Sequence, residues 1–441
     1  MIIQKFGGTS VGSSVRMKQV AELITSDKKP RIVVLSAMSG TTNKLVEISD
    51  HYSRKENEKA LALVEALHQV YKNVVGALFA SVTYQQEGME VIDSHFEYLR
   101  SFAMDMFTAN EVKCVLAQGE LLSSALFDLL LREMGIAACL IPALNFMRID
   151  REGEPDHFYI RQNLERELAS HPDVHLFITQ GFICRDAFGE IDNLKRGGSD
   201  YSASLIGAAV NADEIQIWTD IDGFHDNDPR EVPETHAIAQ LSFEEAAELA
   251  YFGAKILHPA TIQPAKTAHI KVVVKNTMDP LAPGTMISEL ATGDSVKAVA
   301  AKDGITAIRI KSGRMLLAYG FLSKVFEVFE IYKTPIDMIT TSEISVSLTI
   351  DDKTNLEKLL GELEHYGSVE VDTDQVIICV VGEGISSDTL AIVRIMGALE
   401  GIPVRMVSYG GSQNNISILI PSAFKKTALN SLSRELFRKQ S

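Results

Sequence analysis

The feature that most constrains the fold is an alternation of short apolar runs with longer amphipathic stretches across the first 290 residues. The short runs are apolar nearly throughout, which is typical of strands buried on both faces of a sheet. They lie at residues 32–35, 176–178, 215–218 and 272–274. Because strands that alternate with helices favour parallel pairing, the sequence predicts an α/β fold with a mostly parallel sheet sandwiched by helices.

Two of the intervening stretches are predicted to be helical. Leucines and valines recur every three or four residues, a spacing that gives one apolar stripe along a helix. The stripe consists of Leu63, Leu67, Val70, Val74 and Leu78. A second helix is predicted over 119–132.

The sequence changes character after a turn-rich stretch at 279–285, which contains two prolines and a glycine. Beyond it the segments are shorter and form an internal repeat, in which a helix is followed by two short strands. The helices lie at 321–332 and 390–400, and the matching prolines, Pro335 and Pro403, are 68 residues apart. That length suits a β-α-β-β-α-β unit of the ferredoxin-like type.

Counting strands predicts how the two copies are connected. The first copy is complete, but the second ends after a helix at 424–437 and lacks its last strand, whereas the run at 296–300 has no partner. We therefore expect this run to supply the missing strand, so that the first copy is inserted within the second. The predicted domains are a large domain at 1–290, a first small domain at 304–373, and a second at 294–303 plus 374–441.

Charge and composition exclude several functional classes. The 441 residues carry a formal net charge of −16, which repels polyanions, so no nucleic-acid partner and no anionic membrane surface are expected. No uninterrupted apolar run reaches the roughly 18 residues of a membrane-spanning helix. The four cysteines form no CxxC pair, so neither a metal site nor a disulfide framework is predicted. With no signal peptide at the N-terminus, a cytoplasmic location is expected.

Glycine-rich turns supply the first two candidate sites. Lys5 to Gly12 reads KFGGTSVG, a strand-to-helix turn in which glycine amides and a lysine could hold an oxyanion; the alternative is a structural turn. Lys195 to Ser202 reads KRGGSDYS and opens a helix over 203–210. Its arginine could hold a carboxylate through two hydrogen bonds, or it could be a surface residue beside Ser199 and Asp200 acting as helix caps.

Two further clusters contain charged residues next to apolar runs. Trp218 to Phe224 (WTDIDGF), continuing to Asp228-Pro229-Arg230, follows a buried strand, where open α/β sheets bind ligands. The alternative there is a turn with aspartate caps. Phe252 to Pro259 (FGAKILHP) places a lysine in an apolar run, either to contact a phosphate or to reach solvent along its own stem. Its histidine, His258, is expected to be packed.

Two weaker pieces complete the inventory. Leu35 to Asn43 is a hydroxyl-rich turn after a strand, and it could be a second wall of a ligand site or an ordinary polar loop. Gln118-Gly119-Glu120 lies at the predicted start of a helix, where a carboxylate is also favourable to the helix dipole alone.

The order and wording of these clusters resemble the aspartokinases of the amino-acid kinase family. The shared motifs, quoted as they stand in this sequence, are KFGGTSV at 5–11, QGE at 118–120, RGGSDYSA at 196–203, WTD at 218–220, DPR at 228–230 and FGAKILHPAT at 252–261. The resemblance covers essentially the whole chain, since the tail is similar to the paired ACT domains of that family.

The resemblance implies a kinase that transfers phosphate from ATP, with Mg²⁺ on the nucleotide, to the side chain of L-aspartate. It implies a catalytic role for Lys5, Gly8 and Lys255. It places Ser36, Thr42, Glu120, Arg196 and Ser199 around aspartate, with Glu120 on the ammonium and Arg196 on the α-carboxylate. It places Lys5, Gly7, Gly8, Ser10, Thr219, Asp220, His225, Arg230 and Lys255 around ATP.

This chain departs from the family pattern at two of these loops. The family usually has Thr-Leu-Gly before the Arg-Gly-Gly, whereas Asn193-Leu194-Lys195 stands here. A tyrosine of the nucleotide loop is replaced by His225, which puts the stacking or hydrogen bonding at that position in doubt. Neither departure removes a proposed charge.

The resemblance also implies regulation through the tail. Paired ACT domains bind an amino acid at a dimer interface, so a homodimer or a dimer of dimers is expected, with L-lysine as the effector. The residues that match the lysine-sensitive type are Met315, Gly320, Phe321, Leu322, Asp337, Thr341 and Ser342. Asp337 would take the effector's ammonium group, and the alternative is a strand-end carboxylate without a ligand.

Two rival functions stay open at this point. One is a sibling kinase that acts on glutamate or acetylglutamate, against which the tandem tail counts. The other is an amino-acid sensor without activity, against which the joint presence of Lys5, Arg196 and Asp220 counts. A fused homoserine dehydrogenase would need several hundred more residues, so a monofunctional enzyme is expected.

Overall fold

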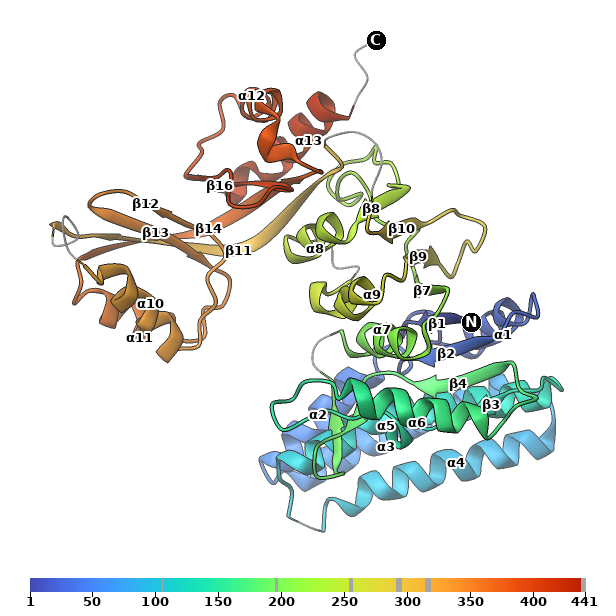
Figure 1. The fold of residues 1–441 in the computed structure, drawn as a ribbon. Coiled ribbons are helices and arrows are strands. Elements are labelled where there is room, and N and C mark those ends of the chain that lie inside the picture. Colours follow the sequence, from blue (N-terminus) through green and yellow to red (C-terminus); the bar gives the residue numbers. More distant parts are fainter. Residues whose placement is uncertain (105, 195–196, 254–256, 291–295, 314–318, 438–441) are drawn as a thin grey trace. The chain divides into compact units, whose positions relative to one another are not determined.

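A computed structural model describes the chain except at residues 105, 195–196, 254–256, 291–295, 314–318 and 438–441 (Figure 1). Contacts within the chain divide it into two compact units. The first contains Met1–Phe224 and Ile256–Leu290, and the second contains His225–Lys255 and Ala291–Ser441. The second unit therefore takes a segment from the middle of the predicted domain at 1–290. The three predicted domain boundaries stay a prediction.

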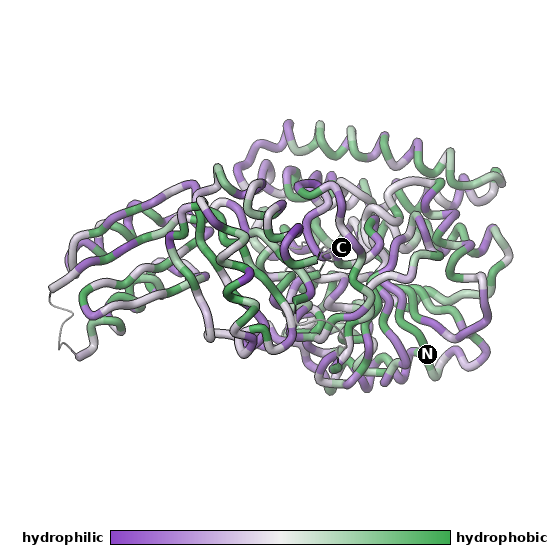
Figure 2. Tube along the Cα trace, turned by 90° about the horizontal axis from the view of Figure 1, so that it is seen from above, coloured by the Kyte–Doolittle hydropathy of each residue, from purple (hydrophilic) through white to green (hydrophobic). Residues whose placement is uncertain are grey.

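A mostly parallel sheet forms the centre of the first unit, as the alternation of apolar runs predicts. The strands that the first unit supplies lie in the order β3 (Cys139–Leu140), β4 (Leu176–Gln180), β2 (Arg31–Leu35), β1 (Ile2–Phe6), β7 (Glu214–Thr219), β9 (Val272–Asn276) and β10 (Thr285–Ser288). Neighbours pair in parallel except β10, which runs antiparallel to β9. Figure 2 shows hydrophobic residues gathered along the strands near the N-terminus.

Helices cover both faces of this sheet. On one face an apolar cluster joins Phe6, Val33 and Trp218 to α1 (Ser14–Ile24), α2 (Thr41–Ser53), α3 (Asn57–Leu78), α4 (Val82–Ser101) and α5 (Ala109–Glu133). On the other face α7 (Gly198–Val210) packs against Ile3 and Ile215 and contacts α6 (His157–Ala169) and α9 (Gln263–Thr267). Shorter elements are β5 (Ile183–Arg185), β6 (Ile191–Asn193), η1 (Ala143–Asn145) and η2 (Pro259–Ile262).

The helices predicted from the apolar stripe at 63–78 and over 119–132 both exist, but their details differ from the prediction. The buried side of α3 is formed by Val64, Tyr71 and Val75, whereas Val70 is 52% exposed. The reason is that Tyr71 belongs to the buried stripe, where its hydroxyl lies 3.0 Å from the Thr41 hydroxyl. The helix expected from residue 119 is α5, which begins ten residues earlier behind a capping box of Thr108 and Glu111.

The long helix α5 is also apolar enough to span a membrane by length and composition alone, but 72% of its apolar window is buried inside the protein.

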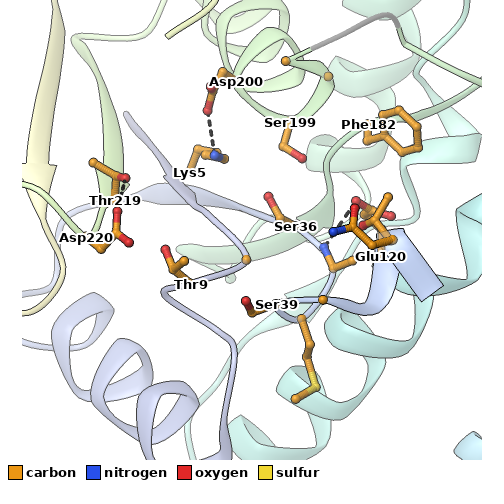
Figure 3. A pocket seen from close by; sticks show the side chains of 18 residues that line it. Lys5, Thr9, Ser36, Ser39, Glu120, Phe182, Ser199, Asp200, Thr219 and Asp220 are labelled. Carbon is orange, nitrogen blue, oxygen red and sulfur yellow. Dashed lines mark hydrogen bonds and ion pairs between the residues drawn. The ribbon is translucent and has the colours of Figure 1, made fainter. Parts of the chain in front are cut away.

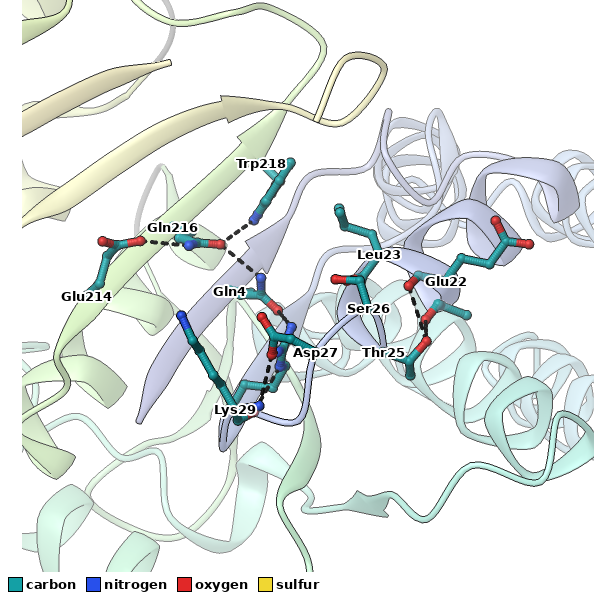
Figure 4. Close-up of polar contacts among 12 residues, drawn as sticks. Gln4, Glu22, Leu23, Thr25, Ser26, Asp27, Lys29, Glu214, Gln216 and Trp218 are labelled. Carbon is teal, nitrogen blue, oxygen red and sulfur yellow. Dashed lines mark hydrogen bonds and ion pairs between the residues drawn. The ribbon is translucent and has the colours of Figure 1, made fainter. Parts of the chain in front are cut away.

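A buried polar network crosses three central strands of the sheet (Figure 4). Gln4 on β1 donates to Gln216 on β7 at 2.8 Å, and the Trp218 indole donates to the same oxygen at 3.0 Å. Arg31 on β2, which is 3% exposed, donates to the Gln4 side-chain oxygen at 3.2 Å. Since buried polar groups are costly without partners, these bonds favour one register of β2, β1 and β7. That register determines where the loops after the strands begin.

The second unit is built on one antiparallel sheet. The strand order is β12 (Ile339–Thr341), β13 (Ser345–Ile350), β11 (Ala298–Lys311), β14 (Ser368–Val381), β16 (Asn415–Pro421) and β15 (Met406–Ser408). The helices predicted at 321–332, 390–400 and 424–437 are α10 (Phe321–Ile331), α12 (Thr389–Ala398) and α13 (Lys425–Leu436), and α11 (Leu356–Leu363) joins them. This unit also contains β8 (Gln240–Ser242), α8 (Phe243–Tyr251), η4 (Ile385–Ser387) and η5 (Ser422–Phe424).

Two strands that the sequence separates are continuous in the structure. Most of the run predicted at 296–300 and the apolar residues that follow at 305–310 form the single strand β11, with register irregularities between Lys302 and Ala307. Gly304, with φ of +77°, lies in this irregular stretch. The first part of β11 pairs with Ile377–Val381 of β14, and the last part pairs with Ser368–Asp372. Both copies of the repeat therefore share β11 and β14.

Helix α8 is held to the rest of the second unit by polar contacts. The Glu248 carboxylate accepts hydrogen bonds from Ser412 at 2.7 Å and from Asn415 at 2.5 Å. Glu231, which precedes the helix in the chain, pairs with Lys425 at 3.2 Å. Lys425 also pairs with Asp303 at 2.8 Å. These contacts explain why the segment 225–255 groups with the C-terminal sheet rather than with the chain on either side of it.

Candidate functional site

A pocket of about 480 Å³ lies at the carboxyl ends of β1, β2 and β7 in the first unit (Figure 3). Ligands of open α/β sheets bind at this edge. Its lining combines the turns after these strands with α5 and the N-terminus of α7. The lining residues are Lys5, Gly8, Thr9, Ser36, Ala37, Met38, Ser39, Gly40, Thr42, Asn43, Glu120, Phe182, Gly197, Gly198, Ser199, Asp200, Thr219 and Asp220.

Lys5 and Asp200 form an ion pair in this pocket. The Lys5 ammonium lies 2.7 Å from the Asp200 carboxylate, and the two side chains are 12% and 14% exposed. Lys5 comes from β1 and Asp200 from the first turn of α7. The N-terminus of α7 adds positive potential beside the Lys5 ammonium. The pairing holds the ammonium at one place while it still borders the open volume.

The sequence analysis gave Asp200 no role beyond helix capping, and that interpretation is wrong. The residue that caps α7 is Gly197, which has a left-handed conformation with φ of 79° and makes no side-chain hydrogen bond. A β-carbon on Gly197 would also lie 2.7 Å from the Thr261 side chain. Because a glycine starts the helix, Ser199 and Asp200 are available to face the pocket.

The first glycine turn packs tightly against the turn that follows β2. A β-carbon on Gly8 would lie 2.9 Å from the Ala37 carbonyl oxygen, so this close approach requires glycine. The Gly7 amide donates to the Trp218 carbonyl at 3.2 Å, and Gly7 is not among the lining residues. Ser10 is fully buried, with its hydroxyl 2.7 Å from that of Thr277, and lies outside the lining as well.

Glu120 is a buried carboxylate with spare capacity. It lies in the middle of α5, so the expectation of a helix-start residue is wrong. The residue is 3% exposed, and one carboxylate oxygen accepts from the Ala37 amide at 3.2 Å. The other oxygen has no hydrogen-bond partner among the described residues. Burial raises the pKa of Glu120 to about 8, although the Ala37 amide and the charge of Lys5 oppose the shift. Such an oxygen would be satisfied by a cationic ligand.

The predicted residues Ser36, Thr42 and Ser199 line the same pocket as Glu120. Phe182 joins them, and the sequence analysis missed it. Its φ of 64° is unusual for a residue with a side chain, and its ring lies where a β-carbon on Gly198 would be at 2.5 Å. The local sequence does not indicate that Phe182 adopts a left-handed backbone conformation, so its place in the pocket could not be predicted. In Figure 3 Glu120 and Phe182 lie on one side of Lys5, and Thr219 and Asp220 lie on the other.

The predicted nucleotide residues are only partly brought together. The Thr219 hydroxyl donates to the Asp220 carboxylate at 3.2 Å, and both line the pocket. His225 and Arg230 belong to the second unit, where His225 lies 2.8 Å from the Thr235 hydroxyl. Arg230 is exposed and pairs with Asp228 through two hydrogen bonds, of 3.0 and 2.8 Å. The predicted site residues Arg196 and Lys255, and the departure at Lys195, lie outside the described residues.

The residues predicted for the effector gather at two places in the second unit. Gly320, with φ of 80°, caps α10, and Phe321 and Leu322 form its first turn. Thr341 ends β12, and the Ser342 hydroxyl lies 2.8 Å from that of Ser345. The Asp337 side chain is 2% exposed and is paired with Lys302. Met315 lies outside the described residues.

Known families and proteins match most of this chain. The model of the amino acid kinase family matches residues 1–276, and a model of the ACT domain matches residues 378–436. The chain is 33% identical to the lysine-sensitive aspartokinase 3 of Escherichia coli, with 99% of both chains covered. It is 32% identical to the chloroplastic aspartokinase 2 of Arabidopsis thaliana, with 99% of this chain and 84% of the relative covered.

Solved structures agree with the sequence matches. The fold is similar to that of E. coli aspartokinase III in complex with aspartate and ADP, in its R-state, with a TM-score of 0.85. It is also similar to the T-state of that enzyme in complex with lysine and aspartate, with a TM-score of 0.83. In both comparisons the identity is 32%, and 99% of this chain and 100% of the other are covered. The chain thus belongs to the amino acid kinase family, and within that family to the aspartokinases.

Proposed function

We propose that this protein is an aspartate kinase, which transfers the γ-phosphoryl group of ATP to the side-chain carboxylate of L-aspartate. The observation that carries the proposal is the position of the Lys5–Asp200 pair between Glu120 on one side and Thr219–Asp220 on the other (Figure 3). An amino acid with its ammonium at Glu120 and a nucleotide at Asp220 would bring their reacting ends together at Lys5. The relatives named as aspartokinases support this choice of acceptor.

The chemistry requires positive charge more than it requires a base. A carboxylate acceptor is already ionised at neutral pH, so it needs no deprotonation before its oxygen bonds to the phosphorus and the bond to the ADP oxygen breaks. The difficulty is to bring two anions together and to hold the charge of the transferring group. Lys5 and the N-terminus of α7 supply part of that charge, and we assign Arg196 and Lys255 the rest.

Substrate binding at Glu120 changes its ionisation. Burial holds the pKa of the free carboxyl at about 8, so it is largely protonated at pH 7. An ammonium group next to the unpartnered oxygen would stabilise the charged form and release the proton. The apparent affinity for aspartate should therefore increase as the pH rises from about 6 to about 8.

The donors in this pocket suit a magnesium ion that is carried by the nucleotide. Among the described residues, no three His, Cys, Asp or Glu side chains lie close enough together to hold a metal. Mg²⁺ keeps several waters and binds through one or two carboxylates plus phosphates, which fits the single carboxylate of Asp220 on the nucleotide side. When bound, the ion would neutralise phosphate charge.

Regulation and assembly complete the proposal. We infer that L-lysine inhibits the enzyme by binding at the second unit, with its ammonium at Asp337, because a lysine-sensitive relative covers the whole chain. A homodimer or a dimer of dimers through the ACT domains and a cytoplasmic location follow from the family resemblance. We also propose the division into a kinase domain and two ACT domains, one inserted in the other, because both copies share β11 and β14.

The test is a panel of acceptors with coupled detection of ADP. With ATP and Mg²⁺, L-aspartate should support turnover, whereas L-glutamate and N-acetyl-L-glutamate should not. Turnover with glutamate but not with aspartate would instead identify a sibling kinase. No turnover with any acceptor would favour a sensor without activity.

A further inference from the structure

A partly buried ammonium group is already bound to the carboxylate that we assign to the effector. Lys302 on β11 lies 2.5 Å from Asp337, and its side chain is 17% exposed. The hydroxyl of Tyr251, the last residue of α8, donates to the same Asp337 oxygen at 2.9 Å. The Lys302 ammonium also lies 4.4 Å from the centre of the Tyr251 ring, within the range of a cation–π interaction.

Only one of the two Asp337 carboxylate oxygens takes part in these contacts. Its second carboxylate oxygen is buried and has no hydrogen-bond partner among the described residues. Lys302 meanwhile has a second anion, since its ammonium lies 2.9 Å from Asp351. Two carboxylates thus share one ammonium, and the cluster carries one uncompensated negative charge when both are ionised. A second ammonium group would find a partner here.

The same cluster determines the position of the end of α8. This helix belongs to the stretch His225–Lys255, which groups with the second unit but is joined to the first unit at both of its ends. Tyr251 is four residues before Lys255 in the sequence. Any change that frees Tyr251 therefore acts on a segment that is covalently continuous with the kinase part of the chain.

We propose that Lys302 and Tyr251 form a latch on Asp337, and that the ammonium group of an amino-acid effector opens it by taking their place. The proposal rests on the effector site proposed above and adds how it is regulated. Displacement leaves no charge buried and alone, because Lys302 stays paired with Asp351 while the newcomer pairs with Asp337. Tyr251 loses its acceptor, so the end of α8 is released.

The latch reduces the apparent affinity for the effector. A ligand that must displace an internal occupant binds more weakly, in proportion to the fraction of molecules in which its site is free. Tyr251→Phe removes one bond that the effector has to break but keeps the ring. Lys302→Met removes the competing ammonium and keeps most of the apolar stem. Both variants should therefore bind L-lysine more tightly than the wild type.

The experiment is calorimetric titration of L-lysine into the full-length wild type and variants, which requires no catalytic activity. We expect the dissociation constant to fall about tenfold in Lys302→Met and several-fold in Tyr251→Phe. The matched control for the lysine is Lys425→Met, because Lys425 also bridges two carboxylates and is also 17% exposed. The control for the tyrosine is Tyr409→Phe, which removes a hydroxyl bond to the Ser386 carbonyl of 2.8 Å. Neither control should change the constant.

Hydrogen exchange supplies the second measurement. Amides of the last turn of α8 should exchange faster in wild type with L-lysine than without it, and faster in Tyr251→Phe than in Tyr409→Phe without any ligand. Lysine affinity that is unchanged or weaker in both latch variants, or no binding of lysine to the wild type, would overturn the latch. Absence of aspartate-dependent ADP release would count against the kinase function instead, since binding is measured separately.

Discussion

The two units each contain a nearly buried lysine–aspartate pair. The residues around each pair determine whether its charge is available to a ligand. Lys5 lies 2.7 Å from Asp200, and Lys302 lies 2.5 Å from Asp337. The first pair borders a pocket of about 480 Å³, so its charge can act on a ligand. The second pair is covered by Tyr251, so its charge is occupied within the protein until the tyrosine leaves.

The carboxylates of the two regions differ in the same way. Asp200 holds a lysine that faces the pocket, and the uncompensated carboxylate of that region is Glu120, which stands apart from the pair. In the second unit the spare oxygen belongs to Asp337 itself, the partner of the lysine. A ligand can therefore reach Glu120 in the first site without contacting its ion pair, whereas in the second, on our proposal, it displaces Lys302 from Asp337. The first arrangement suits turnover and the second suits a switch.

The largest expected effect concerns Lys5 in the ion pair of the first unit. Lys5→Ala should lower kcat about 10³-fold with the fold intact, because a charge aimed at the transition state is lost. ADP release gives the rate, and circular dichroism checks the fold. The control is Lys18→Ala, which removes a partly exposed lysine that donates to the Ala77 carbonyl at 3.2 Å. An unchanged kcat would refute the role of Lys5.

Asp200→Asn tests whether the aspartate positions the lysine. The substitution keeps the shape but weakens the hold on the Lys5 ammonium, so we expect kcat to fall about 10²-fold. The KM for both substrates should change little, since Asp200 is assigned to neither of them. A rise in KM with an unchanged kcat would show instead that Asp200 acts in binding.

Glu120→Gln removes the carboxylate assigned to the substrate ammonium. The KM for aspartate should rise about 10- to 100-fold, the range expected for a lost charged hydrogen bond. Steady-state kinetics at several pH values measures it. The wild-type KM should decrease as the pH rises towards about 8, and the variant should lack this dependence.

Glu120→Gln should also change how the stability of the substrate-free protein depends on pH. Because burial raises the pKa of Glu120, the folded state holds a proton that the unfolded chain has lost, and stability falls as the pH rises from the ordinary carboxyl range to about 8. The glutamine side chain does not titrate, so the variant lacks this loss of stability. The melting temperature of Glu120→Gln relative to wild type should thus increase between about pH 5 and pH 8.5. A constant difference would mean that Glu120 is ionised throughout.

The smallest effect concerns the latch. Tyr251→Phe removes one hydrogen bond at a half-exposed side chain, so it should lower the free energy of unfolding of the second unit by about 0.5–1 kcal/mol. Urea denaturation of the full chain, compared with Tyr409→Phe, measures this loss. A loss several times larger would indicate that Tyr251 supports the fold rather than a switch.

Local sequence patterns predict the sheet well because its strands are apolar throughout. They also indicate most of the pocket, since the turns after β1, β2 and β7 carry its glycines, hydroxyls and carboxylates. Asp200 was missed because its partner Lys5 precedes it by 195 residues, and a local pattern offers only a cap at that position. Glu120 was placed at a helix start although the capping residues Thr108 and Glu111 signal an earlier one.

The second unit shows where prediction from local patterns fails. The polar residues near Gly304 predict a break, but β11 continues through them as an irregular strand because β14 pairs on both sides of that point. The segment 225–255 gives no compositional sign that it groups with the C-terminal sheet. Its attachment depends on long-range contacts such as those of Glu248 and Lys425. The proposed latch on Asp337 likewise depends on residues that are far apart in the sequence, Tyr251, Lys302 and Asp337.

Direct detection of the product tests the central claim. Aspartyl phosphate formed from ATP, Mg²⁺ and L-aspartate can be trapped with hydroxylamine and identified as aspartyl hydroxamate. We expect the wild type to form hydroxamate and ADP in equal amounts, and Lys5→Ala to form a trace of hydroxamate at most. ADP release without hydroxamate, or equal hydroxamate from both proteins, would contradict this claim.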